Sequence, residues 1–170
     1  MKNMKIDKNY KGLIDEGWRY RIEGNIEVEL ELEIDLDKGL FVDGSIKAGG
    51  SIEAGGSIEA GDWIKAGGWI EAGDWIKAGG WIEAGGCLVA ALYITCKTTL
   101  KVGINIFAGV CYWRKSADED KVITCGKLLG GCIEYGILKE TGIREEEDKA
   151  VEEAIKLLES KGIIKEGELK

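Results

Sequence analysis

The side chains that most often carry out catalysis are scarce in this sequence. Its 170 residues include no histidine, which removes Ser-His and Cys-His nucleophile activation, the usual general base at neutral pH and most catalytic zinc sites. The five cysteines form no C-x-x-C pair, and their spacings fit no zinc pattern; they are Cys87, Cys96, Cys111, Cys125 and Cys132. We therefore expect no catalytic residue, cofactor or metal, and a protein that is not an enzyme.

Four tryptophans at six-residue intervals are the first candidate for recognition: Trp63, Trp69, Trp75 and Trp81. Each precedes an isoleucine that we expect to point inward, so strand alternation places the indoles outside. Outward indoles form contact surfaces for a subunit, a protein partner or a sugar. The alternative is that they lie over the corners of the fold and cover glycine backbone.

An acidic row is the second candidate, and it consists of Glu23, Glu27, Glu29, Glu31, Glu33, Asp35 and Asp37. Alternate residues of a strand stand about 7 Å apart, so such a row can imitate a phosphate backbone and occupy a basic nucleic-acid groove. The alternative is a solvated edge that discourages aggregation. Calcium is a further option, but the regular spacing shows no ligand loop.

These side chains are positioned by a hexapeptide repeat. Residues 44–85 read as seven units of the type G-S-I-E-A-G or D-W-I-K-A-G without an insertion. A fixed short period indicates a solenoid whose coils bury one another. Aliphatic, outward and small residues in succession follow the period-2 logic of a strand, and the glycines suit corners.

The same phase continues beyond the obvious repeats in both directions. Every sixth position is a branched aliphatic residue: Ile22, Val28, Ile34, Leu40, Ile46, Ile52, Ile58, Ile64, Ile70, Ile76, Ile82, Leu88, Ile94, Leu100 and Ile106. Small or apolar residues follow two positions later. Residues 22–36 also fit one long amphipathic strand of an ordinary sheet, because the two-residue period of a strand is contained in the six-residue period of the repeat. After Ala108 the phase breaks and resumes with the inward pairs Ile123/Cys125, Leu129/Gly131 and Tyr135/Ile137.

Charge pairing favours three hexapeptides, or 18 residues, per coil over two. At 18-residue spacing there are two oppositely charged neighbours, Lys65 with Glu83 and Glu59 with Lys77, and two like-charged pairs. At 12-residue spacing there are two oppositely charged pairs and three like-charged pairs, which is less favourable. The fifteen repeats then give five coils, and one more follows the break. In such a coil Trp63 and Trp81 share a face.

We expect three segments: an N-terminal cap at 1–21, a β-helix at 22–141 with a loop at 111–121, and a C-terminal helix and tail at 142–170. The first eight residues do not read as a signal peptide, and no apolar run reaches membrane-spanning length. Reduced thiols and a cytoplasmic location follow as expectations. The net charge of -8 argues against direct binding to nucleic acid or membrane and favours a basic protein partner.

The I-x-A-G units, the loop and the expected C-terminal helix resemble the left-handed β-helix of hexapeptide-repeat acyltransferases and related carbonic anhydrases, over about residues 22–160. The chain departs from that family by placing Gly or Asp two positions before the aliphatic residue, as at Asp62 and Gly68. The family's catalytic and zinc-binding histidines have no counterpart, so the resemblance implies a scaffold without that activity. Bactofilins, which polymerise end to end, are a looser resemblance.

The sequence therefore predicts an all-β solenoid that is non-catalytic and presents a surface for protein association, with self-assembly into a homo-oligomer as one form of it. The alternative function is an acidic, nucleic-acid-mimicking inhibitor of a basic nucleic-acid-binding protein, of the kind phages and plasmids encode. A third hypothesis is a histidine-free transferase that uses a carboxylate such as Glu119 in a cleft between subunits.

Overall fold

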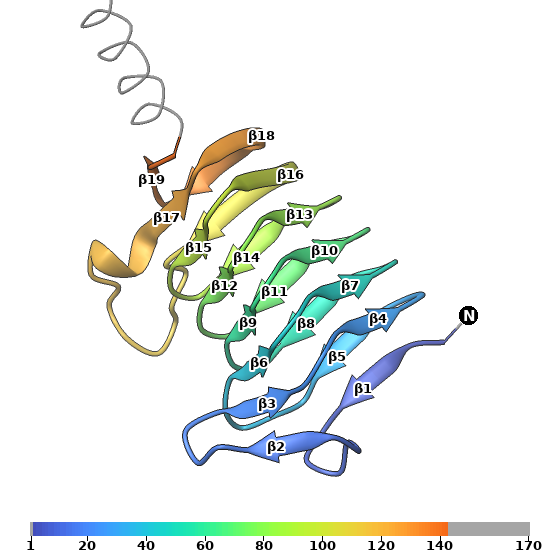
Figure 1. Cartoon of the computed structure of the whole chain (residues 1–170). Helices are drawn as coiled ribbons and strands as arrows, with labels where there is room; N and C mark the ends of the chain where they lie inside the picture. Colours follow the sequence, from blue (N-terminus) through green and yellow to red (C-terminus); the bar gives the residue numbers. More distant parts are fainter. Residues whose placement is uncertain (1, 143–170) are drawn as a thin grey trace, which may run out of the picture.

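The computed structural model describes residues 2–142 and shows a parallel β-solenoid of about seven turns. Each turn takes about 18 residues, since Ile46, Ile64 and Ile82 pair in register on successive strands. This confirms the predicted fold class and coil size. Figure 1 shows the coils stacked in chain order, from blue to orange. The predicted C-terminal helix and tail lie outside the described residues, apart from Gly142.

Three columns of parallel strands make up three faces. The first face contains β4 (Ile26–Val28), β7 (Ile46–Ala48), β10 (Ile64–Ala66), β13 (Ile82–Ala84) and the first half of β16 (Thr99–Ala108). The second contains β1 (Met4–Ile6), β5 (Leu32–Ile34), β8 (Ile52–Ala54), β11 (Ile70–Ala72), β14 (Leu88–Ala90) and the second half of β16.

The third face contains β2 (Leu13–Asp15), β3 (Tyr20–Ile22), β6 (Leu40–Val42), β9 (Ile58–Ala60), β12 (Ile76–Ala78), β15 (Ile94–Cys96), β17 (Val122–Cys125) and β19 (Ile137–Glu140). The final strand of the first two faces, β18 (Lys127–Tyr135), pairs along β16. All these pairings are parallel except β2 with β3, which form an antiparallel hairpin at the N-terminal end. A short 3-10 helix, η1 (Glu119–Lys121), lies between β16 and β17.

The core is a stack of repeated side chains. The seven isoleucines from Ile46 to Ile82 are fully buried, and the alanine two residues after each is nearly so. Branched aliphatic side chains fill the centre of the coil and suit extended backbone. Alanine leaves room where the chain approaches a corner. Residues 45–84 therefore form a core without any irregular element.

The predicted phase is wrong at the N-terminal end by two residues. The first inward position on β3, β4 and β5 is taken by Tyr20, Ile26 and Leu32. The predicted residues Ile22, Val28 and Ile34 therefore occupy the second inward position, where they align with Val42, Ala48 and Ala54. The turn between β5 and β6 contains the two extra residues. A shift of two keeps the same side chains inward, and all three remain buried. The turn also becomes wider at this corner.

The C-terminal prediction is wrong in register as well. Ile123 and Cys125 are buried as expected. Leu128 and Ile133 then pair with β16 at its inward positions, whereas Leu129 and Tyr135 are exposed. Register shifts along β16 and β18 produce this change, because an irregular pairing breaks the six-residue count.

Within residues 2–142, no helix has the length and apolar character needed to cross a bilayer.

Candidate interaction surfaces

The tryptophans occupy the corner position, the residue immediately before each strand. Trp63 and Trp81 lie above one another on the first face, with ring centroids 4.8 Å apart and planes inclined by 2°. On the third face Trp75 stacks on Tyr93 at 5.8 Å and 7°. The indoles therefore lie on three different corners, as 18 residues per coil requires. Of the four, Trp69 is the most open, at 48% exposed.

One coil has serine at all three corners, and the next has tryptophan. Ser45, Ser51 and Ser57 precede β7, β8 and β9, and each is at least nine-tenths buried. Three of the four indoles are themselves half-buried. The buried part of each of these three rings therefore fits the alternative that the indoles pack over the corners of the fold. The predicted use of the indoles in association stays a prediction.

The acidic row wraps around the solenoid instead of lying on one face. Glu27 lies on the first face and Glu33 on the second, and Asp35 and Asp37 follow in the wide turn. Lysines neutralise several of these carboxylates. The Lys47–Glu27 pair measures 2.5 Å, Lys5 contacts both Glu33 (2.7 Å) and Asp35 (2.8 Å), and Lys8 contacts Asp37 (2.9 Å). Hydrogen bonds to the carboxylate, the larger effect from Lys8 and a smaller one from Tyr20, hold the pKa of Asp37 below its usual value.

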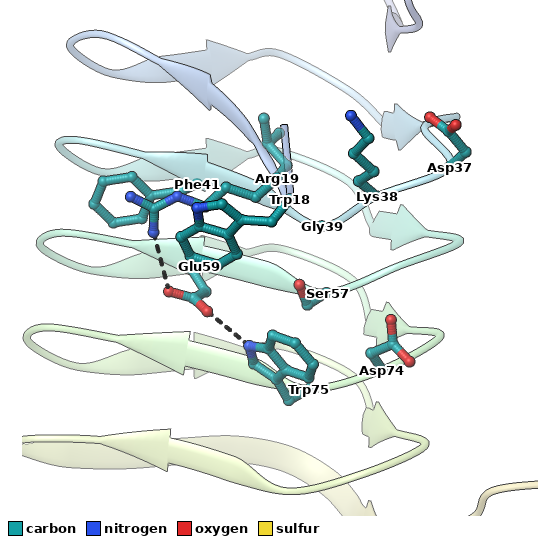
Figure 2. Close-up of a pocket in the computed structure, with 11 residues that line it drawn as sticks. Trp18, Arg19, Asp37, Lys38, Gly39, Phe41, Ser57, Glu59, Asp74 and Trp75 are labelled. Carbon is teal, nitrogen blue, oxygen red and sulfur yellow. Dashed lines mark hydrogen bonds and ion pairs between the residues drawn. The ribbon is translucent and has the colours of Figure 1, made fainter. Parts of the chain in front are cut away.

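A cavity of about 210 Å³ opens at the corner before the third face, and Figure 2 shows its walls. We call it the corner cavity. It lies between the β2–β3 hairpin and the first tryptophan of its column. Its lining is Trp18, Arg19, Asp37, Lys38, Gly39, Leu40, Phe41, Ser57, Glu59, Asp74 and Trp75.

A carboxylate and a guanidinium group organise the inner wall of the corner cavity. The Glu59 side chain is only 14% exposed, and its Oε1 accepts a hydrogen bond of 2.8 Å from Trp75 Nε1. Its Oε2 lies 4.0 Å from Arg19 Nη1 and 4.0 Å from Lys77 Nζ. The Arg19 guanidinium lies 4.3 Å from the ring centroid of Trp18 and 4.2 Å from that of Phe41. Cation–π attraction thus holds Arg19 between two rings.

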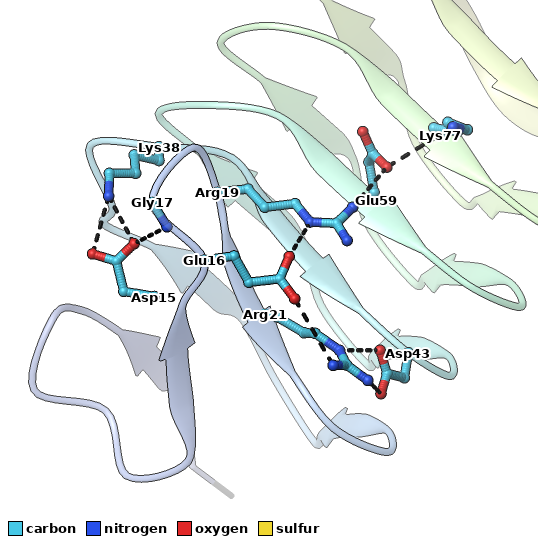
Figure 3. A network of polar contacts seen from close by, with 9 residues as sticks. All are labelled: Asp15, Glu16, Gly17, Arg19, Arg21, Lys38, Asp43, Glu59 and Lys77. Carbon is cyan, nitrogen blue, oxygen red and sulfur yellow. Dashed lines mark hydrogen bonds and ion pairs between the residues drawn. The ribbon is translucent and has the colours of Figure 1, made fainter.

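Ion pairs attach the hairpin that roofs the corner cavity (Figure 3). Lys38 Nζ donates to both oxygens of Asp15 at 2.8 and 3.0 Å. Arg21 forms a bidentate pair with Asp43 at 2.7 and 2.6 Å. Lys38 lowers the pKa of Asp15, with help from the Gly17 backbone N–H, and Arg21 lowers that of Asp43. The roof is therefore fixed to the second coil.

The five cysteines differ in how deeply their side chains are buried. Cys96 and Cys125 are buried at matching inward positions of neighbouring coils, and burial raises their pKa values to about 12 and about 11. Cys87 and Cys111 are half-buried, Cys132 is exposed, and all five thiols are free. In the described part of the chain, no three Cys, Asp or Glu side chains gather as a metal ion would need.

Exposed apolar side chains gather toward the C-terminal end. Of the eleven large hydrophobic residues that are exposed among those described, eight lie at or after position 104: Ile104, Val110, Tyr112, Trp113, Leu129, Tyr135, Ile137 and Leu138. They belong to β16, β18, β19 and the loop that follows β16. We call this set the C-terminal apolar surface. It was not among the sequence candidates. Two of its members, Leu129 and Tyr135, are exposed by the register shifts of β18.

The chain matches no protein-family model, no curated protein and no solved structure. The parallel solenoid of about 18 residues per turn is consistent with a hexapeptide-repeat β-helix, and no match supports the resemblance to acyltransferases or bactofilins.

Sequence reasoning also missed the corner cavity. Its walls come from residues as far apart as Trp18 and Trp75, and the two-residue insertion before β6 widens the turn beside it. One signal was available. In this corner column, the aromatic residues Trp75 and Tyr93 are preceded by the small residues Gly39 and Ser57, which leave space beside Trp75.

Proposed function

We propose that this protein is a non-catalytic β-solenoid that associates with a second copy of itself. The C-terminal apolar surface is the observation that carries the proposal. Its members are concentrated in the last coils, and gatherings of exposed apolar side chains are uncommon on monomers and characterise interfaces. Aromatic residues, which interfaces favour, contribute three of its eight members: Tyr112, Trp113 and Tyr135.

The strands at the C-terminal end favour the same proposal. In the described residues, β18 and β19 are the last members of their ladders, whereas β1 and the antiparallel β2 end two of the three columns at the other end. Edge strands offer unpaired backbone groups to another chain. The two ends therefore differ, and association through the C-terminal end is the expected mode.

Light scattering on the full chain, across a range of concentrations and at low and high salt, tests this proposal. We expect mass to grow with concentration and to persist at high salt, because burial of apolar side chains is not screened. Leu129→Lys and Ile104→Lys replace side chains that are 54% and 56% exposed and should return the protein to a monomer. Ile14→Lys, at the N-terminal hairpin, is the matched control and should leave the mass unchanged.

A clean monomer at every concentration contradicts self-association. Equal effects of Ile14→Lys and Leu129→Lys would show that the C-terminal apolar surface is not the interface.

A second function, mimicry of nucleic acid, is favoured by one column of charges. Glu33, Glu53 and Glu71 lie directly opposite one another on successive strands of the second face. Strands stand about 4.8 Å apart and like charges opposite one another are destabilising, so the column costs stability. Reversal of Glu53 and Glu71 to lysine should abolish capture of a basic nucleic-acid-binding protein. Unchanged capture would remove this candidate.

A further inference from the structure

The corner column beside the third face is an aromatic stack with two vacant positions. Its successive members are Arg19, Gly39, Ser57, Trp75 and Tyr93. Trp75 covers Tyr93 with one face, so its other face is directed toward the coil of Ser57. The two positions without a ring separate the level of Trp75 from that of Arg19 by three strand spacings, or about 14 Å along the column. One flat group in van der Waals contact on both sides needs about 7 Å.

Two polar groups of the corner cavity are unused: a carboxylate, which only accepts hydrogen bonds, and a hydroxyl, which accepts or donates. Ser57 is only 4% exposed, and its hydroxyl, which lines the cavity, has no hydrogen-bond partner among the described residues. The Asp74 carboxylate likewise makes no ion pair or hydrogen bond with that part of the chain. Figure 2 shows Ser57 between Gly39 and Trp75, and Asp74 beside Trp75.

The other charged groups around the corner cavity are already paired. Arg19 contacts Glu16 at 2.7 Å, Lys38 contacts Asp15 at 2.8 Å and Asp37 contacts Lys8 at 2.9 Å. Glu59 receives the Trp75 indole N–H. The cavity therefore keeps one uncompensated negative charge, on Asp74, next to an aromatic face. A ligand that fits must be flat, must donate hydrogen bonds and must carry positive charge.

We propose that the corner cavity binds a guanidinium group, stacked on Trp75 and paired with Asp74. Guanidinium is planar, carries five N–H donors and no acceptor, and stacks on aromatic rings. Asp74 accepts two of these donors and Ser57 accepts a third. A neutral sugar fits less well, because it leaves the Asp74 charge without a counter-charge and because the Lys38 ammonium, a donor for sugar oxygens, is held by Asp15. The volume of about 210 Å³ suits one such group and is below that of drug-sized pockets.

The protein already holds a guanidinium in this way a short distance along the same column. Arg19 lies between Trp18 and Phe41 at 4.3 and 4.2 Å. The proposed ligand repeats that contact one or two coils further on. This site is separate from the C-terminal apolar surface, so guanidinium binding and self-association can be tested independently of each other.

The repeat supplies a matched control. Asp62-Trp63 and Asp74-Trp75 begin two separate units with the identical sequence D-W-I-K-A-G. The first pair lies on another corner, which no hairpin of residues 2–142 covers. Asp62 does not line the corner cavity. Asp74→Asn and Asp62→Asn thus remove the same charge from the same local sequence.

The test is a titration of the full chain with N-acetyl-arginine amide, followed by the NMR signals of the tryptophan indole N–H groups. We expect the Trp75 signal, assigned with Trp75→Leu, to shift and saturate with a dissociation constant on the order of 1 mM. Asp74→Asn should weaken binding at least tenfold, and Asp62→Asn should not change it. N-acetyl-lysine amide and methyl glucoside should shift the Trp75 signal much less.

The guanidinium could belong to a free small molecule or to a partner protein. Equal affinity for N-acetyl-arginine amide and for a Gly-Arg-Gly peptide supports a free ligand, and tighter binding of the peptide supports a protein side chain. Equal binding of the lysine compound, stronger binding of the glucoside or equal losses in Asp62→Asn and Asp74→Asn would each overturn the proposal. So would the lack of any saturable shift. Circular dichroism verifies that each variant is folded.

Discussion

The strongest test of the coil geometry is a pair of glycine substitutions at the same position of the repeat. Gly55 and Gly67 each follow the inward alanine of a hexapeptide. A Cβ added to Gly67 would lie 2.0 Å from the Gly49 carbonyl oxygen, whereas one added to Gly55 would meet its nearest atom, the Leu36 oxygen, at 3.8 Å. Neither glycine has a positive φ, so space alone separates the two substitutions.

The cost of Gly67→Ala follows from that contact. An ordinary Cβ contact is at least 3.0 Å, so the turn must move by about 1 Å. Movement of that size breaks the bonds from Gly67 N to Ala48 O (3.0 Å) and from Gly68 N to Gly50 O (2.9 Å). Each bond contributes about 0.5–1.5 kcal/mol, and overpacking adds about 1–3 kcal/mol. We expect a loss of about 2–6 kcal/mol in the free energy of unfolding.

Gly55→Ala should be neutral or stabilise the protein by up to about 1 kcal/mol, because alanine restricts the unfolded chain. For a chain of this size 1 kcal/mol shifts Tm by roughly 2–4 °C. Gly67→Ala should therefore lower Tm by roughly 4–24 °C, and Gly55→Ala should leave it equal or slightly higher. Thermal melts by circular dichroism, at one protein concentration, measure the difference. Equal melting temperatures for the two variants would refute the coil geometry at this corner.

The remaining predictions concern thiols and pH. Cys132 should react first with a thiol reagent under native conditions, and Cys96 and Cys125 only on unfolding; rapid labelling of either would show that the core is open. Because the folded pKa values of those two thiols are raised to about 12 and about 11, their contribution to stability should be lost as pH rises above about 9, which melts at graded pH would detect. The pKa of Asp43 is lowered by Arg21, so its contribution is present above the unfolded value near 3.8 and lost as pH falls below it; Asp43→Asn should reduce the loss of stability in acid, and an unchanged acid transition would contradict this.

The repeat made much of the fold predictable. Unbroken hexapeptides indicated a solenoid, and charge at the outward position selected 18 residues per coil. The structure confirms that choice through the registers of Lys65 with Glu83 and of Glu59 with Lys77. The inward positions of Cys96 and Cys125 were also predicted, because alternation continues through β15 and β17.

Register outside the perfect repeats could not be predicted. A shift of two residues leaves every side chain on its original side, so the pattern before Leu40 was the same for both alignments. Only the pairing of Ile26 with Ile46 and of Leu32 with Ile52 distinguishes them. Irregular pairing of β16 with β18 likewise exposed Leu129, which the six-residue count had placed inside.

The sequence by itself determined the periodic part of this protein: which side chains point inward, how many residues form a coil and which corners receive tryptophan. These properties depend on local alternation and repeat length, which a sequence states directly. The tertiary structure decided what surrounds identical units. Asp62-Trp63 and Asp74-Trp75 have the same neighbours in sequence, but only the second pair lies beneath the hairpin that carries Trp18 and Arg19. Contacts between coils, set by the insertion before β6 and by the hairpin, make the difference.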